Sequence, residues 1–298
     1  MFDKRVVIAA LARDCADALR INIPRIEDLR KNFKESTVII IENDSKDDTK
    51  NILHKWEERS SNVHIESNDY GTITIPASPH NGKLLTTSYH RIGKMAQYRN
   101  QYIDIVQKRK IESDYLIIID VDIEYFSIDG IINSLKHAPK DWGALFAYGI
   151  SKTNRLNMNR FYDIFAFLEK GVAISDINLS ANLLWKLQRK LSLVIPFYKY
   201  YPCNSAFGGL AIYKSKAIKK LKYECIKNNI NNNIECLCEH VPMNYQITQR
   251  GYNNYISRSM KVRYSVTCNW ITHILSFFLS HKQYTQLKKL LWNNPNNN

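Results

Sequence analysis

The stretch Leu116-Ile117-Ile118-Ile119-Asp120-Val121-Asp122 decides how the first half of this chain is expected to fold. A short run of large aliphatic residues, most of them β-branched, is typical of a strand buried on both faces inside a parallel sheet. Two acids follow the run directly, and their charges cannot stay buried without partners. Because ligands of open α/β sheets bind beyond the carboxyl ends of the strands, we expect Asp120 and Asp122 to reach a binding crevice.

The residues alone leave two interpretations of this acid pair open. Carboxylate oxygens suit Mg²⁺ or Mn²⁺, and such an ion is usually bridged to the phosphates of a substrate. A strand end whose acids are simply solvated explains Asp120 and Asp122 equally well, since Asp-x-Asp is a short and common pattern.

Two similar apolar runs precede this stretch. Residues 6–12 and 37–41 predict buried strands, and apolar residues at helical spacing follow each of them. Pro24 is expected to break or kink the first of these helices. A further helix is expected over 91–108, after a long loop (67–87) of the kind that often acts as a functional lid. Alternating strands and helices predict a parallel sheet with right-handed crossovers.

The charge of the chain favours anionic partners. It has 298 residues, 45% of them hydrophobic, which is enough for a sizeable core, and a formal net charge of +14. Nucleotides, phosphorylated lipids, an anionic membrane face and nucleic acid all suit such a charge. Two segments, 183–201 and 270–292, mix cations with apolar and aromatic residues. Each suits an anionic membrane surface, although a core helix with a wet basic face is slightly favoured.

Targeting and cysteine patterns indicate a cytoplasmic protein. No signal peptide opens the chain, and no stretch approaches the ~20 apolar residues that span a bilayer, so peripheral membrane attachment is the remaining option. The six cysteines are scattered, which favours reduced thiols. Cys236, Cys238 and His240 offer three zinc ligands without the usual paired spacing, so structural zinc is disfavoured.

Three motifs in order resemble those of a known enzyme family. They are Glu42-Asn43-Asp44-Ser45-Lys46-Asp47-Asp48-Thr49, Arg99-Asn100 and Asp120-Val121-Asp122. Together they resemble glycosyltransferases of the GT-A fold, with Glu42 and Asn43 standing where that family has an acid pair. The resemblance covers roughly the first half of the chain. It implies a Rossmann-like α/β fold, with a mainly parallel central sheet, helices on both faces and a smaller, less regular acceptor-side carboxyl half.

The resemblance also implies a division of the chain. We expect a single domain over 1–298, with a nucleotide-sugar-binding half (1–125), an acceptor-binding half (126–280) and a partly disordered tail (281–298). It further implies that a divalent cation, Mn²⁺ or Mg²⁺, is held by Asp122 with help from Asp120, and that Asp120 alternatively binds ribose hydroxyls. Residues implied to bind the nucleotide sugar are Ala9, Leu11, Arg13, Glu42, Asn43, Arg99, Asp120 and Val121.

In the carboxyl half, the segments 203–213 and 238–241 look more loosely like capsule-associated α-mannosyltransferases and their bacterial relatives. This likeness implies that Glu239 is the base that deprotonates the acceptor in an inverting reaction, beside the catalytic Asp122. His240 is implied as a third metal ligand. A purely structural role for this histidine is supported about equally well. The implied acceptor-binding loop contains Asn204, Ser205, Gly208 and Gly209.

The sequence therefore predicts a metal-dependent glycosyltransferase that moves a sugar from a UDP- or GDP-sugar donor to a glycan, glycolipid or glycoprotein acceptor. A haloacid-dehalogenase-like phosphatase with Asp120 as phosphoryl acceptor is the first alternative. That family usually has its motif on the first strand and Thr or Val where Glu124 stands here. A basic nucleic-acid-binding protein is the non-enzymatic alternative. It lacks any recognisable binding module, so no nucleic-acid partner is expected.

Overall fold

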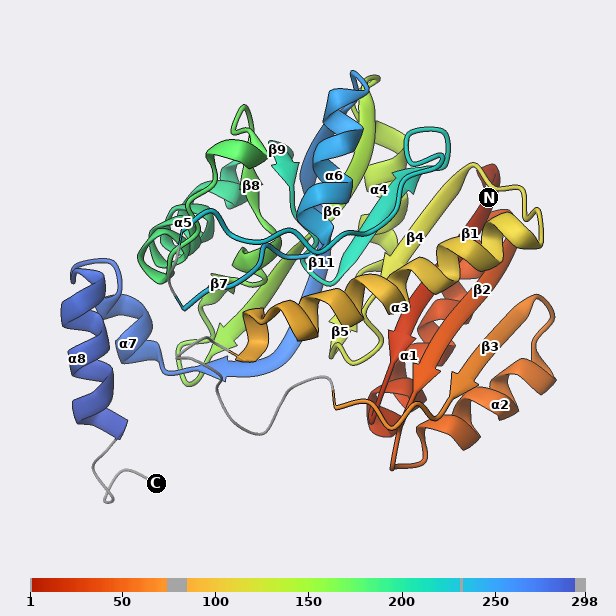
Figure 1. The fold of residues 1–298 in the computed structure, drawn as a ribbon, viewed down its shortest axis with the longest axis horizontal. Coiled ribbons are helices and arrows are strands. Elements are labelled where there is room, and N and C mark those ends of the chain that lie inside the picture. Colours follow the sequence, from red (N-terminus) through yellow and green to blue (C-terminus); the bar gives the residue numbers. More distant parts are fainter. Residues whose placement is uncertain (1, 74–84, 231–232, 293–298) are drawn as a thin grey trace.

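The computed structural model describes residues 2–73, 85–230 and 233–292. Its amino-terminal half is a layer of four parallel strands in the order β3-β2-β1-β4 (Figure 1). These strands are β1 (Phe2–Ala12), β2 (Phe33–Asn43), β3 (Val63–Asn68) and β4 (Tyr115–Ile119). The helices between them are α1 (Ala16–Arg30), α2 (Thr49–Arg59) and α3 (Tyr89–Lys108), the last preceded by a 3₁₀ turn, Leu85–Thr87.

The carboxyl half extends the same sheet to eleven strands, in the order β3-β2-β1-β4-β10-β6-β11-β9-β8, with β5 on β11 and β7 on β6. β10 lies antiparallel between β4 and β6, and only β6 and β11 pair in parallel in this half. The strands are β5 (Tyr125–Phe126), β6 (Trp142–Thr153), β7 (Asn159–Phe161), β8 (Leu168–Glu169), β9 (Tyr200–Ser205), β10 (Leu210–Lys214) and β11 (Asn253–Cys268). The helices are α4 (Ile128–His137), α5 (Ala181–Val194), α6 (His240–Gln249), α7 (Trp270–Leu275) and α8 (His281–Trp292), with 3₁₀ turns at Ile164–Ala166, Ile174–Asp176 and Ile195–Phe197.

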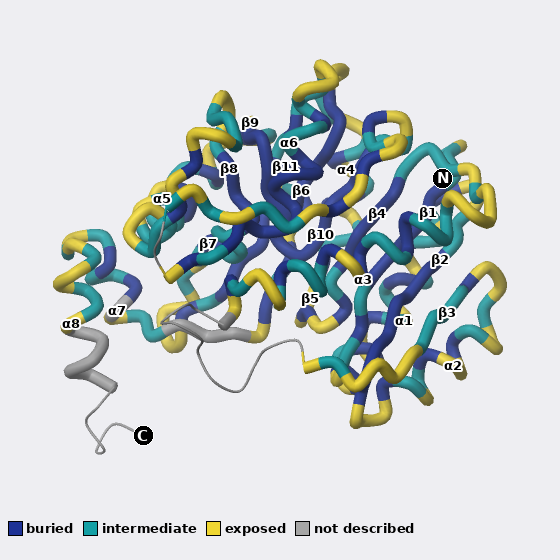
Figure 2. The backbone as a smooth tube through the Cα atoms, in the orientation of Figure 1, coloured by how far each residue is buried: buried dark blue, intermediate teal, exposed yellow. Residues whose placement is uncertain are grey.

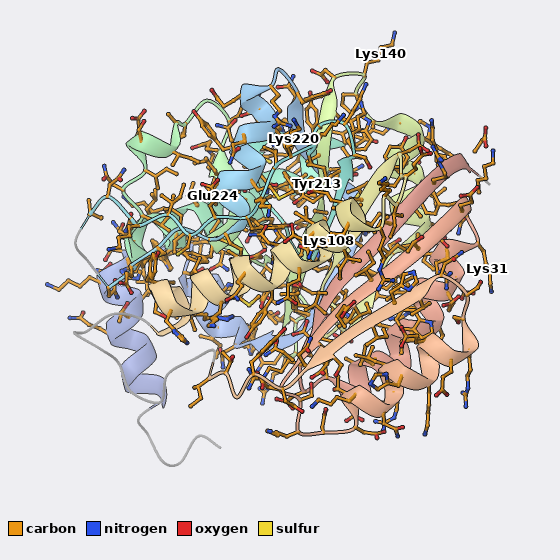
Figure 3. The ribbon with its side chains drawn as sticks, turned by 45° about the vertical axis from the view of Figure 1, so that its right-hand side comes forward. Lys31, Lys108, Lys140, Tyr213, Lys220 and Glu224 are labelled. Atoms are coloured by element: carbon orange, nitrogen blue, oxygen red, sulfur yellow. The ribbon has the colours of Figure 1, made fainter. Side chains whose placement is uncertain are left out.

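Helices cover both faces of the sheet and enclose two cores. Alternate residues of each strand point to opposite faces, so Val7 and Ala9 of β1 join one core and Val6 and Ile8 the other. The first core includes residues of α3, α5 and α6, and the second includes residues of α1, α2 and α4. Figure 2 shows the buried strands running through the middle of the molecule, and Figure 3 shows Tyr213 inside while Lys31 and Lys140 project outward at the periphery.

The fold class predicted from the sequence is confirmed: parallel strands at the centre, helices on both faces, and a less regular carboxyl half. Of the two outcomes expected at Pro24, a break is wrong, because α1 continues through this residue to Arg30. The central part of the expected lid, residues 74–84, lies outside the described residues. Of the tail expected to be partly disordered, residues 281–292 form α8 and 293–298 lie outside the description. Among the described residues, no helix is long and apolar enough to cross a membrane.

Candidate active site

A cavity of about 400 Å³ lies beyond the carboxyl ends of β1, β2 and β4, where the two halves of the sheet meet. This is the position at which ligands of open α/β sheets bind. Both halves of the chain contribute to its walls. Its lining residues include Leu11, Arg13, Asn43, Arg91, Tyr98, Arg99, Asp120, Asp122, Tyr162, Asp163, Phe165, Phe207, Glu239, His240 and Tyr264.

Asp120 and Asp122 both line this cavity, as the sequence predicts. The backbone of Asp120 is fixed by its N–H, which donates to the Gly209 carbonyl of the loop before β10 at 2.9 Å. The hydroxyl of Tyr264 on β11 donates to Asp120 Oδ2 at 2.9 Å, and Arg99 Nη2 lies 3.7 Å from Oδ1. Asp122 is exposed at the cavity mouth. The first acid is therefore held in place, and the second is open to a ligand.

Arg99 connects the two halves of the site. Its side chain, 5% exposed, comes from α3, and its Nε donates to Glu239 Oε1 at 2.9 Å. The guanidinium also lies over the rings of Phe207 and Tyr223, 5.1 and 5.8 Å from their centroids. A buried arginine needs such compensation, and here it receives a carboxylate from the carboxyl half and a second, Asp120, from β4. Arg99 is therefore a fixed positive charge between Asp120 and Glu239.

Three carboxyl groups that line this cavity have raised pKa values. Burial, together with the neighbouring Asp122 charge, raises the pKa of Asp120 to about 7. Burial and then the charge of Asp120 raise the pKa of Asp163 to about 7. The cavity walls partly desolvate Asp122 although its side chain is exposed at the mouth, and this desolvation raises its pKa. Opposite charge favours the ionised form of a carboxyl group, so a cation entering here would lower all three pKa values.

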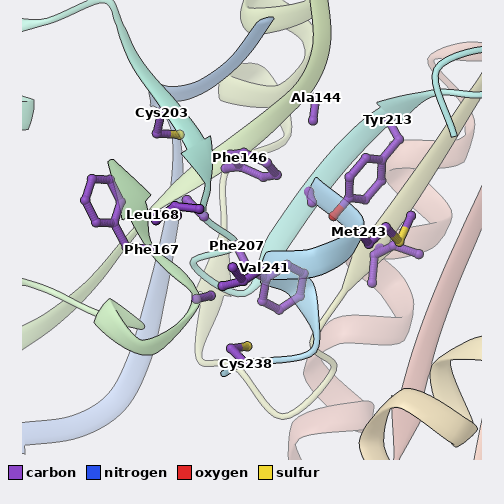
Figure 4. Packing of buried hydrophobic residues seen from close by; sticks show 14 of the residues in the cluster. Ala144, Phe146, Phe167, Leu168, Cys203, Phe207, Tyr213, Cys238, Val241 and Met243 are labelled. Carbon is purple, nitrogen blue, oxygen red and sulfur yellow. The ribbon is translucent and has the colours of Figure 1, made fainter. Parts of the chain in front are cut away.

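Glu239 and His240 stand at the start of α6, on the wall opposite β1. Both are buried. The His240 ring stacks on Phe207 with 4.0 Å between centroids, and burial with the Arg99 charge holds the His240 pKa well below its usual range. Neither ring nitrogen has a hydrogen-bond partner among the described residues. His240 Nε2 lies 3.9 Å from Glu239 Oε1, beyond hydrogen-bond distance, so both ring nitrogens retain their hydrogen-bonding capacity. Figure 4 shows the neighbouring hydrophobic packing, with Phe207 beside Val241 and Cys238 close by.

The donor atoms fit Mg²⁺ or Mn²⁺ bound together with a substrate. Among the described residues, no three His, Cys, Asp or Glu side chains are gathered closely enough to hold a metal ion by themselves. Mg²⁺ keeps several waters and is usually bound by one or two carboxylates plus substrate phosphates, so Asp120 and Asp122 meet its needs.

The residues predicted to bind the nucleotide divide into two groups. Leu11, Arg13 and Asn43 line the cavity, along with Arg99, Asp120 and Asp122. Ala9, Glu42 and Val121 are buried and do not line it. Two of these hold the surrounding backbone in place. Glu42 accepts hydrogen bonds from the Ser45 N–H and the Ser67 hydroxyl, and the Val121 carbonyl accepts one from Asn22 Nδ2 at 3.0 Å.

The acid-rich turn after β2 binds backbone rather than facing the cavity. Asp47 accepts hydrogen bonds from the N–H of Ala16, the first residue of α1, and from that of Thr49, the first of α2. Asp44 accepts hydrogen bonds from the Gly71 and Thr72 N–H groups at 2.7 and 3.1 Å. These acids therefore fix the chain where β1, α1, β2 and α2 meet beside the cavity.

The predicted acceptor residues also divide. Asn204 donates to the Val172 carbonyl and Ser205 to the Ala166 carbonyl, and neither lines the cavity. Gly208 and Gly209, with φ angles of 64° and 86°, form the loop between Phe207, which lines the cavity, and β10. That backbone conformation suits glycine.

Sequence reasoning missed two residues that shape the site. Asp163 has a φ of 64° and accepts the Gly208 N–H at 3.1 Å, which places its carboxyl group in the cavity. Tyr264 stacks on Tyr162 with centroids 3.6 Å apart and binds Asp120. Neither residue follows a buried strand as Asp120 does, and the contacts that define them join segments far apart in the chain.

Comparison with known proteins gives backbone likenesses only. No protein-family model matches the chain. No curated protein matches it either. The mannosyltransferase PcManGT from Pyrobaculum calidifontis, solved with GDP-Man and Mn²⁺, aligns at 11% identity and a TM-score of 0.47, over 97% of this chain and 65% of that chain.

Glucosyl-3-phosphoglycerate synthase from Mycobacterium tuberculosis, solved with Mn²⁺, UDP and phosphoglyceric acid, aligns at 11% identity and a TM-score of 0.44, over 91% of this chain and 73% of that chain. A mycobacterial protein aligns at 11% identity and a TM-score of 0.45, over 89% of this chain and 68% of that one. Since this chain spans 65% of the mannosyltransferase, these likenesses assign it no activity or ligand.

Proposed function

We propose that this protein is a metal-dependent glycosyltransferase that uses a UDP- or GDP-sugar donor and a hydroxyl acceptor. One observation carries the proposal. Asp120 and Asp122 stand at the end of a buried parallel strand and share one cavity with the buried Arg99. Clustered carboxylates beside a fixed cation suit a divalent ion and a diphosphate, because each compensates the charge of the other.

The donor would lie across the ends of β1 and β2. Leu11 and Asn43 line this part of the cavity, with Tyr98 beside them, and they offer apolar and polar contacts to a base and a ribose. Ala9, Glu42 and Val121 would support this wall from beneath. Arg13 and Arg99 would contact the diphosphate, whose negative charge suits a guanidinium.

Asp122, assisted by Asp120, would hold the cation, and a free nitrogen of His240 is a candidate further ligand. A bound divalent cation supplies Lewis-acid charge that stabilises a departing nucleoside diphosphate. The hydroxyl of Tyr264 and the guanidinium of Arg99 keep the Asp120 carboxyl oriented toward the same point.

The acceptor hydroxyl needs a base, and Glu239 is the candidate that the family resemblance implies. Its contact with Arg99 keeps Glu239 oriented, and Gly208 and Gly209 would face the acceptor. Asp163 is a second carboxylate that lines the cavity, where its Oδ2 accepts the Gly208 N–H at 3.1 Å, and it is the alternative candidate for this base. Loss of acceptor transfer with retained donor binding in Glu239→Gln would support the first assignment, and the same result in Asp163→Asn alone would support the second.

The two alternative functions are not favoured. A phosphatase that uses Asp120 as nucleophile needs a free carboxylate, whereas this one is bound by Tyr264 and lies beside Arg99. A nucleic-acid-binding role leaves the cluster of acids in the cavity unexplained.

Thermal shift with nucleotide sugars, with and without Mn²⁺, tests the proposal. A ligand that binds the native state raises its stability, by about 2.7 kcal/mol at a hundredfold excess over Kd. We expect a UDP- or GDP-sugar to raise the Tm only when Mn²⁺ is present. Asp122→Asn should lose this rise, and the matched control Asp28→Asn, at an exposed acid of α1, should keep it. An equal rise in EDTA would contradict the metal role.

A further inference from the structure

The outer side of α5 carries an ordered row of apolar and basic residues, here called the α5 stripe. It consists of Leu183, Lys186, Lys190, Leu193 and, in the 3₁₀ turn that follows, Phe197. The spacing of three and four residues puts them on one side of the helix. Leu193 is 56% exposed and Phe197 is 84% exposed. Figure 2 shows exposed and half-buried residues along this helix.

These apolar residues do not serve the core of the molecule. The buried side of the same segment is formed by Leu191 and Ile195, both fully buried. The sequence analysis slightly favours a core helix with a wet basic face. That interpretation does not account for the exposure of Leu193 and Phe197. The exposed side is amphipathic in composition, and this composition suits the boundary between lipid headgroups and acyl chains.

Cations surround the end of the stripe. Lys199 and Arg258 lie beside Phe197, because Arg258 Nη1 donates to the Pro196 carbonyl at 2.6 Å and the Arg258 N–H donates to the Lys199 carbonyl at 3.2 Å. Lys199 and Arg258 also line a shallow surface pocket with Lys261. The Arg258 guanidinium is therefore bound next to the exposed Phe197, and Lys199 follows two residues later with its ammonium group over the Tyr200 ring. Such cations attract anionic headgroups.

A mainly apolar pocket of about 130 Å³ has lining residues in common with both the stripe and the candidate active site. Leu183, the first residue of the stripe, lines this pocket, and so does Leu187 from the next turn of α5. Phe165 lines both this pocket and the cavity that contains Asp120 and Asp122. The pocket therefore has Leu183 of the stripe and Phe165 of the cavity wall in its lining, together with the polar residues Glu169, Asp176 and Asn178.

We propose that the α5 stripe docks on an anionic lipid bilayer, with Leu193 and Phe197 entering the acyl boundary and Lys186, Lys199 and Arg258 contacting headgroup phosphates. Resting on the proposed glycosyltransferase function, the acceptor is then a lipid of that bilayer, and the Phe165–Leu183 pocket takes the apolar part next to its headgroup. We choose an anionic bilayer as the partner because the exposed charges near the stripe are positive. The pocket shares Phe165 with the candidate active site, so a lipid bound there would lie next to that site.

Sedimentation with vesicles tests the docking without any turnover. The full chain is mixed with vesicles of phosphatidylcholine, or of phosphatidylcholine and phosphatidylglycerol together. We expect binding to the mixed vesicles only, weakened by added salt because screening shortens the reach of the charges. Leu193→Ser with Phe197→Ser should weaken binding about tenfold or more, since both apolar contacts are lost.

Matched control variants distinguish binding through the stripe from the effects of losing any exposed apolar residue or of changing the net charge. Ile21→Ser, at a 52%-exposed apolar residue of α1, should bind as the wild type does. Lys186→Glu with Lys199→Glu should abolish binding. Lys55→Glu with Lys108→Glu, which changes the net charge equally at exposed lysines of α2 and α3, should reduce it only slightly. Thermal melting of each variant verifies that it is folded.

Three results would overturn the docking proposal. They are equal binding to both vesicle types, full binding by the Leu193→Ser, Phe197→Ser variant, and a concentration-dependent dimer that this variant abolishes. The last would make a second copy of the chain the occupant. Nucleotide-sugar thermal shift of the same variant should be unchanged, so failure of the docking and failure of the proposed function give different results.

Discussion

Arg99 is the residue through which the site depends on the whole fold. It comes from α3, binds Glu239 of the carboxyl half and lies 3.7 Å from Asp120, the residue that follows β4. Its side chain and that of Glu239 are each 5% exposed. A buried ion pair adds little net stability, but removal of one partner leaves an uncompensated buried charge.

We therefore expect Arg99→Met to be strongly destabilising, by about 3–5 kcal/mol, because Glu239 loses its cation. Urea denaturation measures this change. The double variant Arg99→Met, Glu239→Gln should recover part of the loss, since no unpaired charge remains. If the two substitutions were simply additive, the pair would not act as a unit and the ion-pair interpretation of Arg99 would be wrong.

At the level of elements, the loop between β9 and β10 brings the two halves of the sheet together at the acids. Gly209 has a φ of 86°, and its carbonyl accepts the Asp120 N–H. A Cβ at this position would lie 2.5 Å from the hydroxyl of Tyr264 on β11. The same loop thus fixes the end of β4 and leaves space for the hydroxyl that binds Asp120.

Gly209→Ala should therefore disturb the site as well as the backbone. Gly171 is a matched control, because its φ is 84° and a Cβ there would contact nothing within 4 Å. Gly171→Ala should cost about 1–2 kcal/mol from backbone strain alone. Gly209→Ala should cost more in urea denaturation and should weaken Mn²⁺-dependent donor binding. Tyr264→Phe added to Gly209→Ala should recover part of the stability. An equal cost for the two alanine variants would contradict this.

For the molecule as a whole, the acidic cavity links stability to pH. The pKa of Asp163 is raised to about 7, so the folded state holds a proton that the unfolded state releases near the ordinary carboxyl pKa. Stability from this group is complete below about pH 4 and is lost as the pH rises through about 7. Asp163→Asn removes the ionisable group.

The wild type should therefore lose stability between about pH 5 and about pH 8, whereas Asp163→Asn should not lose this contribution. The Tm of the variant minus the Tm of the wild type should be larger at the higher pH. Differential scanning calorimetry at the two pH values measures it. In the wild type, Mn²⁺ should raise the Tm more at the higher pH, because metal ligands must be deprotonated. A constant difference between variant and wild type would show that Asp163 does not keep its proton in the folded state.

Much of this molecule could be predicted from local pattern. The strands β1, β2 and β4 are continuous apolar runs, and Asp120, Asp122 and Arg99 lie in or next to elements with clear periodicity. Pro24 was misleading, because α1 continues through it to Arg30. Asp163 and Tyr264 could not be found, because their roles depend on β10 lying antiparallel beside β4 and on pairings between distant segments.

Release of UDP or GDP from a panel of nucleotide sugars, with Mn²⁺ and with EDTA, tests the central claim most directly. The wild type should release the nucleotide from at least one UDP- or GDP-sugar when Mn²⁺ is present and not in EDTA. Asp122→Ala should lose this release, and Asp28→Ala, at an exposed residue of α1, should keep it. Undiminished release by Asp122→Ala would contradict the assignment of the metal and diphosphate site to the end of β4.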